Sequence, residues 1–277
     1  MIHNQIAAAC CVSLIMFFQG SISMISFILA SWELLLLILA NLFSRGTGMM
    51  LGPRSSMAVD SCYCLSWRFA VEANNAQAWR MVPAQCVFYV ENYMLAGQYN
   101  KDLDMVMEQI STYLNGIVAA DDGMDAWVLD IDDTCLSNLW YYEGKRFGGD
   151  PWDPSTFKSW AQGGLCPAIP AVLRLYKRLK KGGFNVFLLT GRDEEALGAP
   201  TARNLHAQGF IGYERLILRG PSYRGQSAVA FKSAMRKQLV EEGYRIRGNV
   251  GDQWSDLQGD CNGDRIFKIP NPMYFVP

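Results

Sequence analysis

Residues 126–134, AWVLDIDDT, decide the fold of this chain, because a short apolar run passes directly into three acids. The run follows a DDG turn at 121–123, and its length and apolarity indicate a buried strand of a parallel sheet. Asp130 and Asp132 are two residues apart, so in an extended chain their side chains project to the same side. Crowded carboxylates at a strand end are unfavourable unless a cation neutralises them, and Mg²⁺ prefers oxygen ligands. Acids in a solvated surface turn are the simpler alternative.

Strands and helices alternate downstream of this run. Helices are expected at 168–183, 193–209 and 226–243, and strands at 184–189, 215–219, 244–251 and 265–269. This alternation predicts an α/β fold with a parallel sheet and helices on both faces, whose ligands bind beyond the carboxyl ends of the strands. Upstream, the pattern from Trp67 to about Ala119 predicts an N-terminal helical region of two or three helices.

Polar residues also follow two other expected strands. Thr190 and Gly191 end the strand at 184–189, where hydroxyl and main-chain donors can hold a phosphate, although such a pair also suits an ordinary helix entry. Asp252 and Asp256 follow the strand at 244–251 and share one helix face, where Asp252 is alternatively a helix cap.

Lys232 lies in an expected helix and, taken alone, would be a solvated lysine. Together with the acids and Thr190 described above, Lys232 completes a set of groups: a nucleophile, a proton donor, cations for phosphate oxygens and a metal site. Phosphoryl transfer requires this set.

VLDIDDT, LLTGR, the lysine of FKSAMRK and GDQWSD stand in the order of the four motifs of the haloacid dehalogenase (HAD) superfamily, which this chain resembles. More narrowly, the chain resembles plant acid phosphatases of the class B type, relatives of the vegetative storage proteins. SWRFAVEANN (66–75), GFIGYERLILR (209–219) and the ending KIPNPMYFVP (268–277) carry that likeness, which extends from about residue 62 to the C-terminus. The resemblance implies a HAD-like Rossmannoid fold and hydrolysis of small phosphate monoesters.

The resemblance also implies roles for individual residues. Asp130 would attack phosphorus and form an aspartyl-phosphate, and Asp132 would act as general acid and then general base. Thr190, Gly191 and Lys232 would bind the phosphoryl group. Mg²⁺ would be held by Asp130, the main-chain carbonyl of Asp132, Asp252 and Asp256.

A small cap is expected at about 138–165, between the first strand and the next helix. Its segment 138–160 holds seven aromatic residues, which would either stack on the leaving group of a substrate or pack the insertion onto the body. Cys135, beside the first motif, is expected to be a small buried filler rather than a nucleophile.

Two other functions remain open. Some storage-protein relatives lack the attacking aspartate, and a storage protein with little catalysis is the main alternative, although this chain keeps Asp130. A phospho-accepting receiver also uses Asp, Thr and Lys on a parallel sheet, but its acidic pair precedes the phosphorylated aspartate on another strand.

The N-terminal residues form a leader. Residues 5–43 hold one charged side chain, Glu33, and indicate either a cleaved signal peptide, which would have ordinary length if translation began at Met24, or a retained membrane anchor. A buried helix of a globular domain is the third alternative. Residues 1–50 are therefore assigned to the leader, with a linker to about residue 60 and the phosphatase domain at 61–277. The expected location is the secretory pathway, then the extracellular space or vacuole, or a membrane if the leader is retained.

The net charge bears on the class of binding partner, and the cysteines bear on disulfide formation. The net charge of −1 argues against a nucleic-acid binder, and a homodimer is one of the oligomeric states left open. A secreted chain is expected to pair some of its eight cysteines, and the candidate pairs are Cys64 with Cys86 and Cys166 with Cys261.

Overall fold

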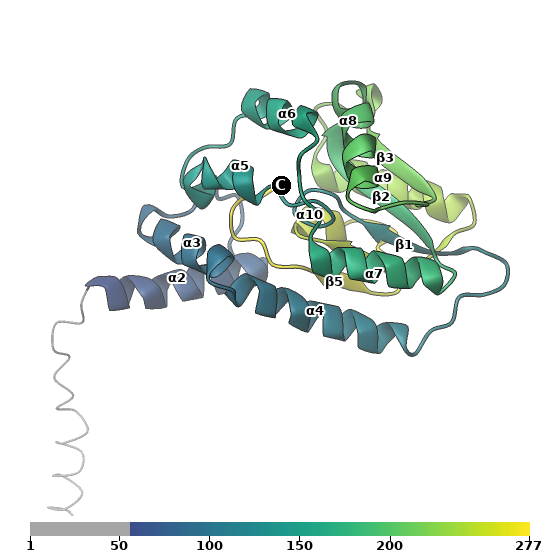
Figure 1. Cartoon of the computed structure of the whole chain (residues 1–277), viewed down its shortest axis with the longest axis horizontal. Coiled ribbons are helices and arrows are strands. Elements are labelled where there is room, and N and C mark those ends of the chain that lie inside the picture. The colour runs from purple at the N-terminus through teal and green to yellow at the C-terminus, as the bar shows by residue number, and fades with distance from the viewer. Residues whose placement is uncertain (1–55) are drawn as a thin grey trace, which may run out of the picture. The chain divides into compact units, whose positions relative to one another are not determined.

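The computed structural model describes residues 56–277; the expected leader and most of the expected linker lie outside the described residues. Five parallel strands form one sheet in the order β3-β2-β1-β4-β5. The strands are β1 (Asp125–Leu129), β2 (Asn185–Asp193), β3 (Arg215–Arg219), β4 (Arg245–Gly251) and β5 (Ile266–Lys268). The expected parallel α/β fold is confirmed, and the strand that precedes the three acids lies at its centre (Figure 1).

Each face of the sheet packs against helices, because alternate residues of every strand point to opposite sides. Trp127 and Leu129 of β1 pack with residues of α4 (Gln98–Leu114), α7 (Pro170–Lys181) and α8 (Glu194–Ala207). Ala126 and Val128 pack on the other side, with residues of α9 (Ala228–Glu241). Figure 1 shows α4 and α7 running side by side along one side of the sheet.

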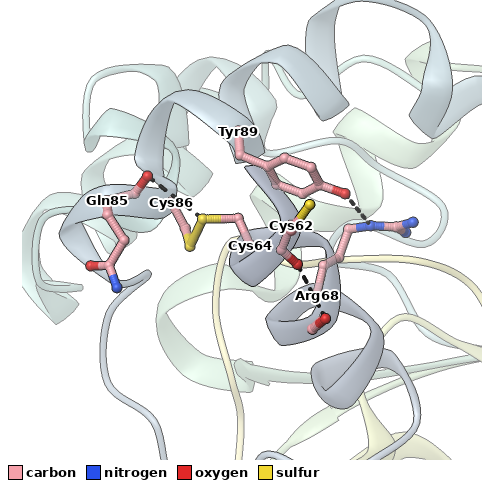
Figure 2. Close-up of a disulfide and its surroundings, with 7 residues drawn as sticks. Cys62, Cys64, Arg68, Gln85, Cys86 and Tyr89 are labelled. Atoms are coloured by element: carbon pink, nitrogen blue, oxygen red, sulfur yellow. Dashed lines mark hydrogen bonds between the residues drawn. A yellow bond between two sulfur atoms is a disulfide. The ribbon is translucent and has the colours of Figure 1, made fainter. Parts of the chain in front are cut away.

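The expected N-terminal helical region consists of α2 (Ser56–Glu72), the 3-10 turn η1 (Ala84–Cys86), α3 (Val87–Leu95) and α4. Helix α2 begins inside the expected linker, so the ordered fold starts earlier than residue 61. Cys64 of α2 and Cys86 of η1 form a disulfide, which confirms one expected pair (Figure 2). The neighbouring Arg68 donates to Tyr89 at 3.3 Å and further ties α2 to α3.

The second expected pair, Cys166 with Cys261, is wrong: both cysteines are free. Cys166 lies beyond the carboxyl ends of β1 and β2, with Sγ 3.5 Å from Oδ1 of Asn138. The loop that carries Cys261 instead runs beside the beginning of β4, where Asp264 N–H donates to Ile246 O at 2.9 Å. The two thiols therefore belong to opposite ends of the sheet. Cys135 is fully buried in the core, as expected.

The insertion after β1 contains α5 (Leu139–Glu143), the 3-10 turn η2 (Arg146–Gly148) and α6 (Pro154–Gly163). Three of its aromatics are buried against α3 and the C-terminal segment: Tyr141, Tyr142 and Phe147. Packing onto the body is therefore the role of these three, whereas Trp140 and Trp152 are exposed.

Short helical segments complete the domain: η3 (Pro221–Tyr223) and α10 (Trp254–Leu257). Between residues 56 and 277, the helices are all too short or too polar to traverse a lipid bilayer.

Candidate active site

Asp130 stands immediately after the central strand, where its main-chain N–H donates to Val250 O of the adjacent β4 at 3.0 Å. Its carboxylate forms a close ion pair with the ammonium of Lys232, which comes from α9 on one face of the sheet. The same ammonium lies 2.5 Å from Oδ1 of Asp256 in α10. Residues from three separate elements therefore meet at the carboxyl end of the sheet.

Lys232 is 4% exposed, contrary to the ordinary expectation for a lone lysine on a helix. Burial of an ammonium is tolerated here because two carboxylates surround it. Arg236, one turn further along α9, is fully buried and donates to main-chain carbonyls of Asp256 and Gln258, at 2.8 and 2.5 Å. One face of α9 thus supplies the cation of the site and fixes the segment that carries Asp256.

A possible cation site is formed by three buried carboxylates. Asp130, Asp252 and Asp256 each offer an oxygen, and these oxygens lie within 4.8 Å of one another. All three donors are hard oxygen ligands, which fits a hard divalent cation such as Mg²⁺ better than a soft metal. The carboxylate of Asp132, in contrast, is outside this group of three.

Gly251 allows β4 and α10 to approach each other at this site. A Cβ at residue 251 would lie 2.4 Å from Oδ2 of Asp256, closer than any real side chain allows. The same carboxylate oxygen accepts the main-chain N–H of Gln253 at 2.9 Å. Glycine is therefore required where the chain turns from the strand into the acidic pair.

Asp132 faces a second cation, Arg192, at the end of β2. Nη2 of Arg192 lies 2.7 Å from Oδ1 of Asp132, and Nε lies 3.1 Å from each carboxylate oxygen. Thr190 Oγ1 lies 3.4 Å from Oδ2 of the same carboxylate, which brings Thr190 to the site. Gly191 follows Thr190 and is exposed. β2 continues to Asp193, past the expected strand end at 189, so Thr190 and Gly191 lie within the strand, and the entry into α8 is at Asp193.

Asp133 organises the loop between β1 and the insertion. Its φ of +53° is unusual for a residue with a side chain, and its buried carboxylate accepts the N–H of Asn138 at 2.8 Å. The side-chain amide of Asn138 reaches Asp132 at 2.9 Å. These hydrogen bonds therefore fix the spatial arrangement of the acids at 132 and 133, next to Asp130.

The electrostatics of the site favour an added cation. Five carboxylates gather with two cations: Asp130, Asp132, Asp133, Asp252 and Asp256 with Lys232 and Arg192. Burial raises the pKa of Asp130 well above its usual range, and the charge of Asp256 raises it further. Burial likewise raises the pKa of Asp133 and of Asp252 to about 7. A divalent cation would allow these groups to ionise together.

At Lys232 and Asp132, neighbouring charges outweigh the effect of burial on the pKa. Burial lowers the pKa of Lys232, but the charges of Asp130 and Asp256 outweigh burial and leave the pKa raised. For Asp132, burial raises the pKa, yet the charge and hydrogen bonds of Arg192 prevail and lower it. The two acids of the first motif are thus driven in opposite directions.

Comparison with known proteins identifies the family. The profile of "HAD superfamily, subfamily IIIB (Acid phosphatase)" matches residues 52–277. The chain belongs to this subfamily. It is 44% identical over 217 residues to "Acid phosphatase 1" of Solanum lycopersicum, covering 78% of this chain and 85% of the relative. It is also 36% identical over 226 residues to "Vegetative storage protein 1" of Arabidopsis thaliana, covering 81% and 83%.

Solved structures agree on the fold of the HAD superfamily. The class C acid phosphatase from Bacillus anthracis is similar to this subfamily IIIB chain with a TM-score of 0.57 and 22% sequence identity. The match covers 69% of this chain and 85% of the bacterial one. The family and fold expected from the four motifs are therefore confirmed.

The structure adds residues to this subfamily IIIB site that the sequence did not single out. Arg192 is the last residue of the LLTGR motif, yet only the preceding Thr190 and Gly191 were assigned a function. Arg236 lies four residues after Lys232, and that helical spacing alone was a usable signal. Asn271 and Tyr274, which contact Asp252 and Asp133, come from the C-terminal segment and gave no such signal.

Proposed function

We propose that this protein is an acid phosphatase that hydrolyses small phosphate monoesters through an aspartyl-phosphate on Asp130, with Mg²⁺ as its cofactor. One observation carries the proposal: Asp130, Lys232, Asp252 and Asp256 converge at the carboxyl end of the sheet, with Thr190 and Asp132 beside them. Membership in subfamily IIIB supports it.

Asp130 is the nucleophile in this proposal. An oxygen of its carboxylate bonds to phosphorus while the bond from phosphorus to the ester oxygen breaks, so the leaving group departs with the electron pair. Lys232 holds the attacking carboxylate, and its positive charge also suits the oxygens of the phosphoryl group. The Thr190 hydroxyl and the main-chain N–H of Gly191 would bind the other phosphoryl oxygens.

Asp132 transfers the protons. It gives a proton to the departing ester oxygen, and it then takes one from the water that attacks the aspartyl-phosphate. That second attack releases inorganic phosphate and restores Asp130. Arg192 orients the carboxylate of Asp132 and favours its ionised form, which suits the base step.

Asp130, Asp252 and Asp256 would hold Mg²⁺, together with the main-chain carbonyl of Asp132. The ion would offset the repulsion between an anionic carboxylate and an anionic phosphate.

The test is hydrolysis of an aromatic phosphate ester, measured with Mg²⁺ and with a chelator. Asp130→Asn should lose about 10⁴-fold or more in kcat, because the nucleophile is removed at constant size. Asp125→Asn is the matched control, since Asp125 is a buried aspartate at the other end of β1, paired with Arg245 and Arg247. An Asp130→Asn protein as active as the wild type would refute the proposal.

A storage protein with little catalysis is the second candidate, supported by relatives such as "Vegetative storage protein 1" and "Vegetative storage protein 2" of Arabidopsis thaliana. The retained Asp130 favours the enzyme. A kcat within the usual enzyme range of about 1 to 10³ per second would exclude the storage role as the main one.

We also propose that the protein enters the secretory pathway, with residues 1–50 as leader and residues from about 61 as the phosphatase domain. The disulfide between Cys64 and Cys86 supports an oxidising compartment, because such bonds rarely persist in the cytosol. N-terminal sequencing of the mature protein, with fractionation into soluble and membrane pools, distinguishes a cleaved signal from a retained anchor.

A further inference from the structure

The C-terminal tail, defined as residues 270–277, reaches into the site from outside the four motifs. Asn271 is 2% exposed, and its Nδ2 donates to Oδ2 of Asp252 at 2.7 Å. Tyr274 donates its hydroxyl to Oδ2 of Asp133 at 2.9 Å. The tail thus contacts one acid of the last motif and one of the first.

The contact with Asp252 selects which of its oxygens is free. Oδ2 accepts two amide donors, Nδ2 of Asn271 and Nε2 of Gln253, the latter at 2.8 Å. Oδ1 receives a single weaker contact among the described residues, from Thr134 Oγ1 at 3.4 Å. The paired donors fix the rotation of the carboxylate and leave Oδ1 as the oxygen with the weaker contact, available to a cation.

The tail is itself fixed by contacts with the body of the domain, so it can orient the acids that it contacts. The carboxylate of Glu72, at the end of α2, accepts the N–H of Asn271 at 2.9 Å and pairs with Lys268 at 2.8 Å. Met273 is buried, and a Cβ at Gly148 would lie only 1.9 Å from its carbonyl oxygen, so the tail packs directly against the backbone of Gly148.

Aromatic packing fixes the end of the tail. The ring of Tyr274 stacks on Tyr142 of α5 with centroids 4.8 Å apart, and Figure 1 shows the C-terminus close to α5. Gln253 closes the arrangement, because its Oε1 accepts the N–H of Val276 at 3.1 Å.

We infer that Asn271 and Tyr274 are positioning residues for the site. Asn271 orients the carboxylate of Asp252 toward the cation, and Tyr274 fixes Asp133 and thereby the loop that follows Asp130. The inference rests on the proposed function, because it takes Asp252 as a metal ligand. Groups that orient metal ligands typically contribute about 10- to 100-fold to metal affinity.

The experiment is calorimetric titration of Mg²⁺ into the metal-free full-length protein, without substrate. Asn271→Leu should weaken Mg²⁺ binding about 10- to 100-fold, because one donor to Asp252 is lost. Asn271→Ser, a smaller change, keeps the test available if the leucine variant folds poorly. Asn185→Leu is the matched control: its amide donates to Gly123 O at 2.6 Å at the opposite end of the sheet, so Mg²⁺ binding should not change.

Tyr274→Phe tests the second contact by removing only the hydroxyl. We expect kcat to fall at saturating Mg²⁺ with KM little changed, because the loop of Asp130 loses its support. Tyr113→Phe is the control, since the Tyr113 hydroxyl also donates at 2.9 Å, but to Arg247 O.

The outcomes separate the two proposals. A wild type that binds no Mg²⁺ overturns both the proposed function and this inference. A wild type that binds Mg²⁺, with the same affinity in both Asn271 variants, overturns the inference alone, as does a Tyr274→Phe protein with unchanged kcat for the role of Tyr274.

Discussion

The pairing of Arg192 with Asp132 predicts the pH dependence of catalysis. Three N–H···O contacts of 2.7 to 3.1 Å join the two side chains, and the Arg192 side chain is 1% exposed. Burial alone would raise the pKa of Asp132, but the charge and the hydrogen bonds of Arg192 outweigh burial and lower the pKa. Each pKa unit of this effect corresponds to about 1.4 kcal/mol in favour of ionised Asp132.

Arg192→Met should therefore raise the pKa of Asp132, because the charge and the hydrogen bonds that favour its ionised form are lost. A general acid works in its protonated form, so the loss of activity on the basic side should move to higher pH by the same amount. The assay is kcat/KM from about pH 4 to about pH 8, a profile that reports the pKa of the essential acid in the free enzyme. An alkyl phosphate is the better substrate, because its leaving oxygen depends more on a proton than that of an aromatic ester.

Thr201→Val is the control for this experiment. Thr201 Oγ1 accepts a hydrogen bond from Nη1 of Arg192 at 3.1 Å. The variant therefore removes one contact of Arg192 but keeps its ion pair with Asp132. Its basic limb should stay in place. If a folded Arg192→Met protein keeps the wild-type limb with the alkyl substrate, Asp132 is not the acid or Arg192 does not set its pKa.

Three further predictions concern stability and metal binding. Lys232→Met should destabilise the metal-free protein by about 3 to 5 kcal/mol, because two buried carboxylates lose their partner. In denaturant titrations, added Mg²⁺ should restore part of the lost stability. Equal losses of stability with and without Mg²⁺ would contradict this prediction. The pKa values of Asp133 and Asp252, raised to about 7 by burial, mean that the folded protein binds more protons than the unfolded chain between the usual aspartate pKa and about 7. Stability of the metal-free protein should therefore fall as pH rises through that window, and a Tm that rises instead would refute the assignment. Gly251→Ala should cost about 1 to 3 kcal/mol and weaken Mg²⁺ binding, because its Cβ would collide with Asp256; calorimetry and thermal melts check both, and unchanged values would refute the requirement for glycine.

The sequence was most informative where local patterns dictate structure. The strands at 215–219 and 244–251 were predicted to within a residue, because short runs that alternate with helical segments and lie beside glycines are typical of strands in an α/β chain. Asp130 and Asp252 lie near each other because each follows a strand, and parallel strands end at one edge. Asp256 lies in α10, whose N-cap is Gln253 and not Asp252 as considered from the sequence.

Contacts between distant segments could not be read from one sequence. Lys268 pairs with Glu72 across 196 residues, and Tyr274 reaches Asp133 across 141. The wrong pairing of Cys166 with Cys261 has the same origin, because the spacing of two cysteines does not reveal which end of the sheet each occupies. The boundary of α2 was missed because small and polar residues at 44–60 resemble a linker.

The contact between the tail and the acids also bears on when the enzyme becomes competent during its synthesis. The residues that orient Asp252 and Asp133 follow every strand and helix of the domain along the chain, so they are translated after the acids that they contact. Domains of a nascent chain begin to fold from the N-terminus. Helix α2, η1 and their disulfide therefore come early in synthesis, but an ordered reaction centre has to await residues 270–277.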